Sequence, residues 1–231
     1  DPLWSRGLGD VYKRQRMWRR GLLREVREWC DRTGVMLIAD EVMTGFGRTG
    51  TLFACEQEGV VPDFVALAKG LTGGYMPLGA TLTREDIFDG FTGGVERTLY
   101  YGHSYAGHAL GCAVALENLA IFREERVLEG LQGKIEALRG LLEEWLKPCG
   151  WVHEIRQCGF VVGIELRERD GRVFSGDQMV GSRVCVAARA HGLLTRPIRD
   201  TLVLMPPLCV TEEELRLAVV AIRSAIDDVL G

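Results

Sequence analysis

Residues 35–80, VMLIADEVMTGFGRTGTLFACEQEGVVPDFVALAKGLTGGYMPLGA, decide the fold of this chain. The stretch opens with an apolar run at 35–39, which is too short for a helix and predicts a fully buried strand. A second apolar run at 64–68 predicts a neighbouring strand. Asp40 follows the first run and Lys69 follows the second. Because open α/β sheets bind ligands at the carboxyl ends of their strands, we expect these two side chains to share a site.

Each of these two residues also has an ordinary structural interpretation. Asp40 can cap a turn or pair with Arg48, and Lys69 can be a surface lysine just past a strand. Together they fit a more specific chemistry. A pyridoxal phosphate (PLP) site needs a lysine that bonds to the cofactor and an acid that keeps its pyridine nitrogen protonated. Burial of such a lysine lowers its pKa and makes the amine a usable nucleophile.

Composition and charge narrow the class of protein. Of 231 residues, 47% are hydrophobic and 26% are charged, and the formal net charge is -4. This composition is globular, and the charge provides no basic field for nucleic acid. The sequence has no membrane-spanning apolar stretch and no signal-peptide pattern, so we expect a cytoplasmic protein. The seven cysteines and four histidines lack metal-ligand spacing, which predicts reduced thiols and no metal site.

The segments around this stretch predict further helices and one more strand. Residues 17–33 have the apolar spacing of an amphipathic helix, and residues 76–82 predict a strand at a sheet edge. A short helix is expected at 83–91, and residues 109–123 are apolar around the whole helical cylinder, which predicts a buried helix. Residues 1–16 have neither helical nor strand periodicity and look like a junction sequence. We therefore leave them unassigned and expect this chain to be the C-terminal part of a longer protein.

The second half of the chain predicts a small α+β domain. Short strands are expected at 151–158, 160–166, 193–196 and 201–205, and helices at 126–146, 179–191 and 211–230. The last helix begins with Thr211 followed by three glutamates, the pattern of a capping box. We therefore assign residues 17–125 to the C-terminal part of a large domain and residues 126–231 to a small domain.

Three segments resemble the class III aminotransferases of PLP fold type I, which have an α/β, aspartate-aminotransferase-like fold. They are IADEVMTGFGRTGTLFACE at 38–56, PDFVALAKGLTGGYMPLGATL at 62–82 and YGHSYAGHALGCAVAL at 101–116. The lysine that stands 29 positions after the aspartate makes this combination specific. The resemblance extends from residue 17 to the C-terminus. It implies a partial large domain, a C-terminal α+β small domain and PLP as the cofactor.

The resemblance also implies a role for each matching residue at the cofactor. Lys69 corresponds to the Schiff-base lysine, which also carries the proton between the substrate Cα and C4′ of the cofactor. Asp40 corresponds to the partner of the pyridine nitrogen, and Val42 to an apolar residue against the ring face. His103 and Ser104 correspond to the turn that reaches the cofactor phosphate of the neighbouring subunit, in a homodimer with shared active sites.

Three further residues are assigned to substrate binding by the same resemblance. Gly102 begins the phosphate turn, Arg196 corresponds to the arginine that grips the carboxylate of the keto acid, and Arg48 to an arginine near the substrate pocket. Arginine suits a carboxylate through its bidentate geometry. Without the resemblance, the turn residues would be simple turn formers and Arg196 a surface ion pair.

Two positions depart from the family pattern. His108 stands where the pattern has asparagine before proline, which predicts a slightly altered phosphate turn. Arg199 stands where glycine is common, which predicts an altered loop beside Arg196.

Within the class, the motifs FACE, AKGLTGGYMPLGATLT and TRPIRDTLVLMPP are most similar to the branch that serves biotin biosynthesis. This implies transamination of 7-keto-8-aminopelargonate to 7,8-diaminopelargonate, with S-adenosylmethionine as amino donor. One alternative is another class III aminotransferase that moves an ω-amine to pyruvate or a similar keto acid. Another is a truncated, non-catalytic remnant that binds no cofactor. Nothing before residue 17 resembles the family's N-terminal half, which supplies the first phosphate turn and the aromatic residue that stacks on the ring.

Overall fold

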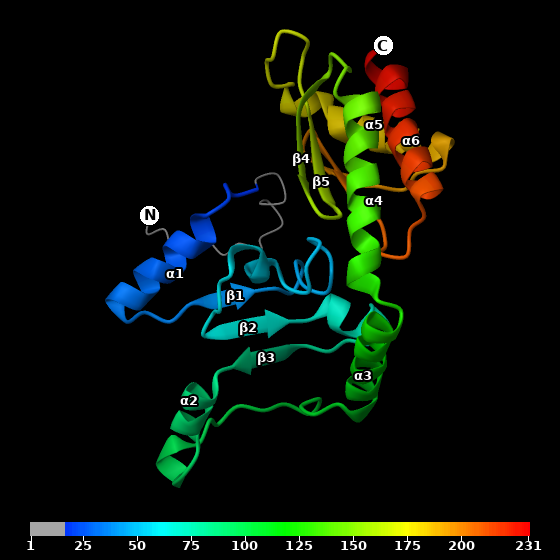
Figure 1. Ribbon diagram of the computed structural model, residues 1–231. Helices are drawn as coiled ribbons and strands as arrows, with labels where there is room; N and C mark the ends of the chain where they lie inside the picture. The colour runs from blue at the N-terminus through cyan, green and yellow to red at the C-terminus, as the bar shows by residue number, and fades with distance from the viewer. Residues whose placement is uncertain (1–16) are drawn as a thin grey trace. The chain divides into compact units, whose positions relative to one another are not determined.

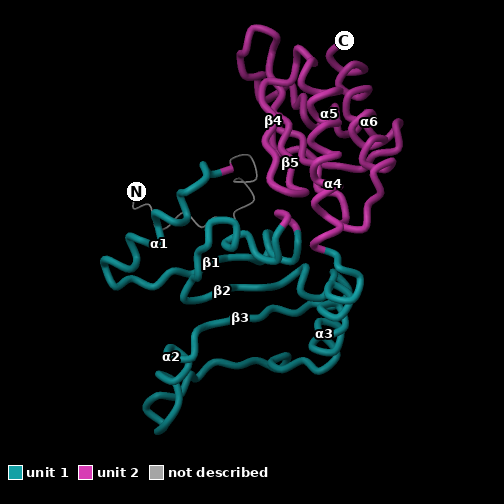
Figure 2. Tube along the Cα trace, viewed as in Figure 1, with its two compact units in different colours: residues 1–9, 18–47, 51–127 teal, residues 10–17, 48–50, 128–231 magenta. Residues whose placement is uncertain are grey.

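The computed structural model describes residues 17–231, and the junction-like residues 1–16 lie outside the described part. The chain divides into two compact units (Figure 2). The first comprises residues 18–47 and 51–127, and the second is built mainly from residues 128–231 and includes 48–50. The domain boundary at residue 125 stays a prediction. No helix in residues 17–231 has the length and apolar character needed to cross a membrane.

The first unit is built on a three-stranded sheet with the order β1-β2-β3 (Figure 1). Helix α1 (Leu22–Thr33) ends at Gly34, whose positive φ of 68° closes the helix before β1 (Ile38–Asp40). β1 pairs in parallel with β2 (Phe64–Leu67), which confirms the predicted pair of neighbouring strands. β3 (Ala80–Thr83) pairs antiparallel with β2 and begins later than the predicted strand at 76–82.

β1 is not the fully buried strand that its apolar run predicts. Side chains alternate between the two faces of a strand, and only the face that contains Leu37 and Ala39 is buried. Ile38 on the other face is 65% exposed, and Asp40 is exposed beside it. The buried face packs on α1 and on the segment around Cys55, whereas no described segment of the first unit covers the opposite face.

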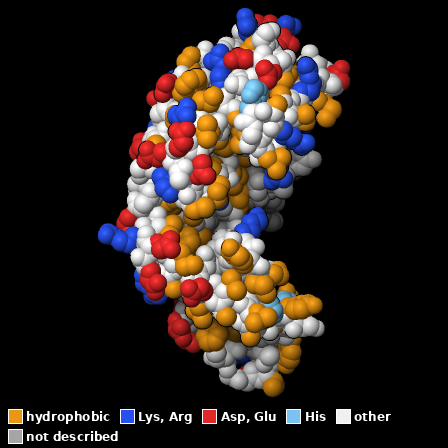
Figure 3. Space-filling model, turned by 90° about the vertical axis from the view of Figure 1, so that its right-hand side faces the viewer, with side chains coloured by type: hydrophobic (Ala, Val, Ile, Leu, Met, Phe, Trp, Pro, Cys, Tyr) orange, Lys and Arg blue, Asp and Glu red, His pale blue; other side chains and the backbone are white. Residues whose placement is uncertain are grey.

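Helix α3 (Ala109–Glu124) is exposed where a buried helix was expected. Only Gly111 and Ala115 are buried, because one narrow stripe of α3 packs against the buried cluster around Phe46 and Leu71. Leu110 and other apolar residues of the helix remain exposed, and Figure 3 shows hydrophobic side chains gathered on the lower part of its view, which belongs to this unit. The prediction of a buried helix was therefore wrong for the described residues.

A buried carboxylate fastens the start of β2 to its neighbours. Asp63 accepts hydrogen bonds from the Leu37 amide at 2.7 Å and from Arg27 Nη1 at 2.8 Å. Its other oxygen accepts from Arg84, which precedes helix α2 (Glu85–Phe88). Asp63 thus joins α1, β1 and the segment after β3, and it satisfies its own buried charge in doing so.

The second unit has the predicted α+β arrangement. Its antiparallel sheet has the order β4-β5-β7-β6, with strands Val152–Cys158, Val161–Leu166, Thr201–Leu204 and Arg196–Ile198. Its helices are α4 (Val127–Leu141), which continues as a π-helical turn, α5 (Val180–Ala187) and α6 (Glu212–Leu230). The capping box at Thr211 is present, which confirms the predicted start of α6.

Burial is distributed unevenly between the two units. The largest side chains that are almost fully buried all lie in the second unit among the described residues, and they include Phe160, Leu138, Ile164 and Ile222. Most of the exposed large hydrophobic residues lie in the first unit, among them Ile38. The second unit therefore has a well-formed core of its own, whereas the first leaves much apolar surface in contact with solvent.

The turn between β6 and β7 carries a backbone strain that a substitution is expected to relieve. Arg199 has a φ of 52°, the left-handed region that glycine occupies without a Cβ penalty. Arg199→Gly is expected to raise the free energy of unfolding of the second unit by about 0.5–1 kcal/mol, after the larger entropy of glycine in the unfolded chain is subtracted. Urea unfolding followed by circular dichroism would measure the gain.

The matched control is Arg199→Ala, which removes the same side chain but keeps the Cβ. An equal gain in this variant would show that the guanidinium, and not the backbone conformation, is unfavourable.

Candidate functional site

The carboxyl ends of β1 and β2 place Asp40 and Lys69 on the same edge of the sheet. Asp40 is paired with Ala66 in the parallel register, and Lys69 follows three positions after Ala66. Parallel strands bring residues at their carboxyl ends together, which is the arrangement that the two apolar runs predict. Val42, the residue expected against the ring face, follows Asp40 and is half-buried.

The Asp40 side chain is oriented by its own turn. One carboxylate oxygen, Oδ1, accepts a hydrogen bond from the Val42 amide at 3.0 Å. Among the described residues of the first unit, no donor reaches the second oxygen. Asp40 therefore offers a fixed and accessible acceptor to a cationic nitrogen, as the partner of a protonated pyridine must.

Lys69 is the first residue of a short 3-10 helical turn, Lys69–Thr72, and its own φ is 47°. A non-glycine residue in this left-handed region is uncommon and points to a functional constraint. Its side chain is exposed, so the expected desolvation of the amine is not seen. Lys69 is exposed for the same reason as Ile38, because no described segment of the first unit covers this part of the sheet.

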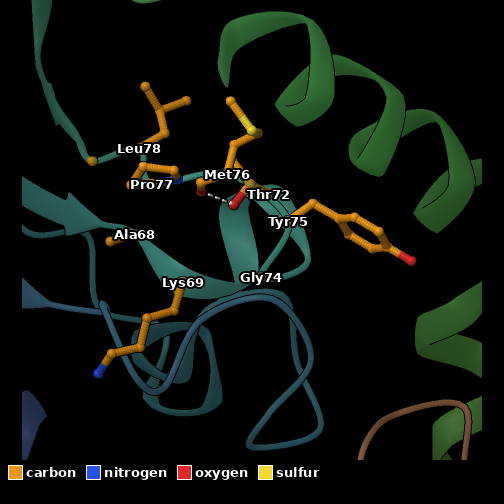
Figure 4. Close-up of a pocket in the computed structure, with 9 residues that line it drawn as sticks. Ala68, Lys69, Thr72, Gly74, Tyr75, Met76, Pro77 and Leu78 are labelled. Carbon is orange, nitrogen blue, oxygen red and sulfur yellow. Dashed lines mark hydrogen bonds between the residues drawn. The ribbon is translucent and has the colours of Figure 1, made fainter. Parts of the chain in front are cut away.

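An open hollow of about 700 Å³ lies beside the backbone of Lys69. Its lining includes Ala68, Tyr75, Met76 and Leu78, and a hydrogen bond of 2.6 Å from the hydroxyl of Thr72 to the carbonyl of Met76 closes the loop (Figure 4). The Lys69 side chain extends away from Met76 and Leu78 in this view. The hollow is thus next to the lysine but is not the space that its amine faces.

The turn that contains Gly102, His103 and Ser104 is exposed and folded on itself. Nδ1 of His103 accepts a hydrogen bond from the Tyr105 amide at 3.2 Å, and its carbonyl accepts one from the Ala106 amide at 2.9 Å. The side chain of Ser104 and the backbone of the turn are accessible to a ligand from outside this chain. Their assignment to the phosphate of a neighbouring subunit stays a prediction.

His108, expected to alter the phosphate turn slightly, caps the start of α3. Its Nδ1 accepts a hydrogen bond from the Gly111 amide at 3.2 Å, at the first turn of α3. An imidazole in its neutral form has one acceptor nitrogen, so it can satisfy one of the free amides at a helix start. His108 therefore supplies a side-chain cap to α3.

Arg196 and Arg48, the two predicted substrate arginines, both lie in the second unit and differ in their partners. Arg196 begins β6, is exposed and forms no ion pair within residues 17–231, so the ordinary interpretation as a surface ion pair does not hold. Arg48 Nη1 instead donates to the carbonyl of Pro206 at 2.5 Å, and burial lowers the pKa of its guanidinium. These contacts favour a structural role for Arg48, and its contact with substrate stays a prediction.

The loop around Arg48 is anchored within the second unit. The Phe160 amide donates to the carbonyl of Arg48 at 2.9 Å, and Gln132 donates to the carbonyl of Gly50 at 2.8 Å. Gly159 has a φ of 56°, and a Cβ there would lie only 2.3 Å from the backbone of Thr49. Only glycine, which has no Cβ, allows this close approach.

Sequence reasoning missed the buried acid next to Asp40. Glu41 is 3% exposed, and its Oε1 accepts from the Cys55 amide at 2.9 Å while its Oε2 accepts from the Thr44 hydroxyl. Burial, together with the negative charge of Glu41, raises the pKa of the Cys55 thiol to about 12. Glu41 fastens the loop after β1. The signal in the sequence was a second acid at the end of an apolar run.

Comparison with known proteins identifies a family that matches most of the chain. A sequence model of the class-III aminotransferases matches residues 16–226. An adenosylmethionine-8-amino-7-oxononanoate aminotransferase of Nitratidesulfovibrio vulgaris is 52% identical over 211 residues, which are 90% of this chain and 39% of that protein. The chain spans about half the length, or less, of the curated relatives that it matches.

Solved structures show the same similarity in three dimensions. The adenosylmethionine-8-amino-7-oxononanoate aminotransferase of Methanocaldococcus jannaschii has a TM-score of 0.90 at 37% sequence identity, covering 95% of this chain and 52% of that chain. An amine transaminase from an uncultivated Pseudomonas species, solved with PLP bound, has a TM-score of 0.81 at 36% identity, covering 89% of this chain and 47% of that chain.

Proposed function

This chain belongs to the class III aminotransferases, and on that premise we propose that it carries the residues that hold the nitrogen and the aldehyde of PLP in an aminotransferase. PLP is the cofactor of this family. The observation that carries the proposal is the parallel register of β1 and β2, which sets Asp40 and Lys69 at adjacent strand ends. The free oxygen of Asp40 and the accessible amine of Lys69 fit the two ends of the cofactor ring.

Each residue has a distinct task in the proposed reaction. When bound, PLP supplies an electron sink for the negative charge that develops at the substrate Cα. Asp40 keeps that sink effective, because its carboxylate holds the proton on the pyridine nitrogen. Lys69 Nζ would hold the cofactor by its aldehyde and would carry the proton between the substrate Cα and C4′.

We propose that the substrates are those of the biotin-pathway branch, with S-adenosylmethionine as donor and 7-keto-8-aminopelargonate as acceptor. The names of the relatives in N. vulgaris and M. jannaschii support this assignment. The unpaired guanidinium of Arg196 is suited to grip the carboxylate of the acceptor. We also propose that the protein is a homodimer in the cytoplasm. The exposed turn at Gly102, His103 and Ser104 supports the homodimer, in which this turn reaches the partner's cofactor phosphate.

A second candidate is another class III aminotransferase that moves an ω-amine to pyruvate or a similar keto acid. The structural likeness to an amine transaminase favours keeping it as an alternative. A non-catalytic remnant is the candidate from a different class. The exposed apolar surface of the first unit favours it for the chain on its own.

The two halves of the reaction test these candidates separately. S-adenosylmethionine is expected to discharge the visible absorbance of lysine-bound PLP in the purified chain, whereas L-alanine is not. Arg196→Ala is expected to lower the efficiency of the subsequent reaction with 7-keto-8-aminopelargonate by roughly a hundredfold, because a carboxylate loses its charged partner. S-adenosylmethionine also carries a carboxylate, so the donor half-reaction of the same variant is measured beside it. Stopped-flow absorbance measures both halves.

Arg199→Ala, an exposed neighbour on the same hairpin, is the matched control and should leave both halves intact. A response to alanine but not to S-adenosylmethionine would contradict the biotin-pathway assignment. No visible band after incubation with PLP would support the remnant.

A further inference from the structure

The turn that bears Lys69 depends on support from outside itself. The left-handed φ of Lys69 costs free energy in any residue with a Cβ, so the conformation persists only where neighbours impose it. The internal backbone bonds of the turn run from the Leu71 amide to Ala68 at 3.0 Å, from the Gly73 amide to Gly70 at 3.2 Å and from the Gly74 amide to Lys69 at 3.3 Å. Such bonds are compatible with several turn shapes, so they do not by themselves select this one.

Asn118 of α3 supplies that support by hydrogen bonding. Its Nδ2 donates to the carbonyl of Gly70 at 2.8 Å and to the carbonyl of Leu71 at 3.2 Å. These are the carbonyls of the two residues that follow Lys69, so both must point toward α3. Asparagine is a poor helix former compared with alanine. Its presence within α3 therefore needs a reason other than the stability of the helix.

Phe46 supports the same turn from another side by packing. A Cβ at Gly70 would lie 2.8 Å from Cβ of Phe46, so the backbone of Gly70 rests directly on this ring. Phe46 is itself buried and makes an edge contact with Phe122 of α3, with ring centroids 6.4 Å apart. The turn is thus fixed by a hydrogen-bonding contact and a packing contact that both involve α3.

We propose that Asn118 is a positioning residue for Lys69, and this inference rests on the proposed function. By fixing the carbonyls of Gly70 and Leu71, Asn118 holds Lys69 in the left-handed conformation and so sets the direction in which its Cα–Cβ bond leaves the strand end. Without those bonds Lys69 relaxes toward negative φ. The amine then no longer stands where a cofactor held by Asp40 presents its aldehyde.

Two substitutions separate hydrogen bonding from packing. Asn118→Asp keeps the size of the side chain but replaces the donor with a carboxylate that repels the two carbonyls, and Asn118→Ala removes both functions. Both variants are expected to weaken the apparent affinity for PLP at least tenfold, as followed by visible absorbance, which corresponds to about 1.4 kcal/mol. Glu117→Ala, an exposed neighbour on α3, is the matched control and should bind PLP as the parent chain does.

A second measurement needs no cofactor. Hydrogen exchange read by mass spectrometry is expected to be about tenfold faster in the peptide covering residues 69–75 in both Asn118 variants, with the peptides of β4 and β5 unchanged. If the parent chain binds no PLP, the proposed function fails for this chain, while the exchange rates still report on Asn118.

Three results would overturn the positioning role. One is parent-like exchange at residues 69–75 in both variants. Another is parent-like behaviour of Asn118→Asp alone, which would assign the effect to packing. The third is faster exchange throughout the first unit or unfolding of both variants, which would give Asn118 a general stabilising role.

Discussion

Replacement of Lys69 by alanine is expected to abolish the covalent labelling of this chain by PLP and borohydride. Only an amine can form the bond that borohydride makes permanent, and Lys69 is the amine at the strand end beside Asp40. In a protein with aminotransferase activity the same change should lower kcat by about 10⁴-fold or more, because the proton carrier is lost with the nucleophile. Mass spectrometry of the peptide that contains residue 69 measures the label directly.

Two further variants make this test specific. Lys147→Ala removes an exposed lysine that pairs with Glu143 in the second unit, and it should leave labelling unchanged. Lys69→Arg keeps the positive charge but forms no stable bond to an aldehyde, so it separates electrostatic attraction of the phosphate from bond formation. Equal labelling of the Lys69→Ala variant and the parent chain would remove the central residue of the proposed site.

Asp63→Asn is expected to produce the largest loss of stability in the first unit, about 3–5 kcal/mol. The change keeps the size of the side chain and its acceptor for the Leu37 amide, but it removes the buried anion that two arginines share, and each arginine keeps only an exposed partner, Asp31 for Arg27 and Asp86 for Arg84. Arg27 is the more costly of the two because its side chain is only 16% exposed. Thermal unfolding followed by circular dichroism would measure the loss.

The same carboxylate predicts a dependence of stability on pH. Burial raises the pKa of Asp63, but hydrogen bonds and charge from Arg27 and the Leu37 amide outweigh this effect and hold the pKa below its ordinary value. A carboxyl group whose pKa is lower in the folded state binds fewer protons there than in the unfolded chain. Its stabilising contribution is therefore complete above the ordinary pKa, near 4, and is lost as the pH falls through the lowered value.

Asp63→Asn should remove this acid-dependent contribution, so the variant and the parent should converge in stability as the pH falls. Asp86→Asn is the control, since Asp86 also pairs with Arg84 but is exposed. If Asp86→Asn were as destabilising as Asp63→Asn, burial would not be the source of the effect.

The sequence alone predicted the connectivity of the fold well. The apolar runs before Asp40 and Lys69 became β1 and β2, and the parallel pairing of the two strands follows from their separation in the chain. The capping box at Thr211 located the start of α6. These features were predictable because they depend on local patterns that few other structures satisfy.

Burial was predicted less well, and for a physical reason. An apolar run such as that before Asp40 indicates what a strand can bury, not whether a covering segment is present in the same chain. Ile38 and Leu110 are exposed for this reason. The prediction of a desolvated Lys69 failed in the same way, because it too assumed a cover over the strand ends.

Tertiary contacts between distant residues could not be predicted at all. The bonds from Asn118 to the turn after Lys69 join residues 48 positions apart, and nothing in the helical pattern of α3 distinguishes this asparagine. The bond from Arg48 to the carbonyl of Pro206 could not be predicted either, and the contact of Arg48 with substrate stays a prediction. Roles that depend on contacts between residues far apart in the sequence can be assigned only from the three-dimensional structure.

The uneven burial of the two units has a consequence for the fate of this polypeptide in a cell. Chaperones and quality-control proteases recognise apolar segments that stay accessible, and the first unit presents such segments around Ile38 and Leu110. The second unit buries side chains such as Leu138 and Ile222 almost fully, so it presents few apolar segments that chaperones and proteases can bind. Turnover of the chain is therefore expected to begin at the strand ends that carry Asp40 and Lys69, so its abundance depends on whatever binds there.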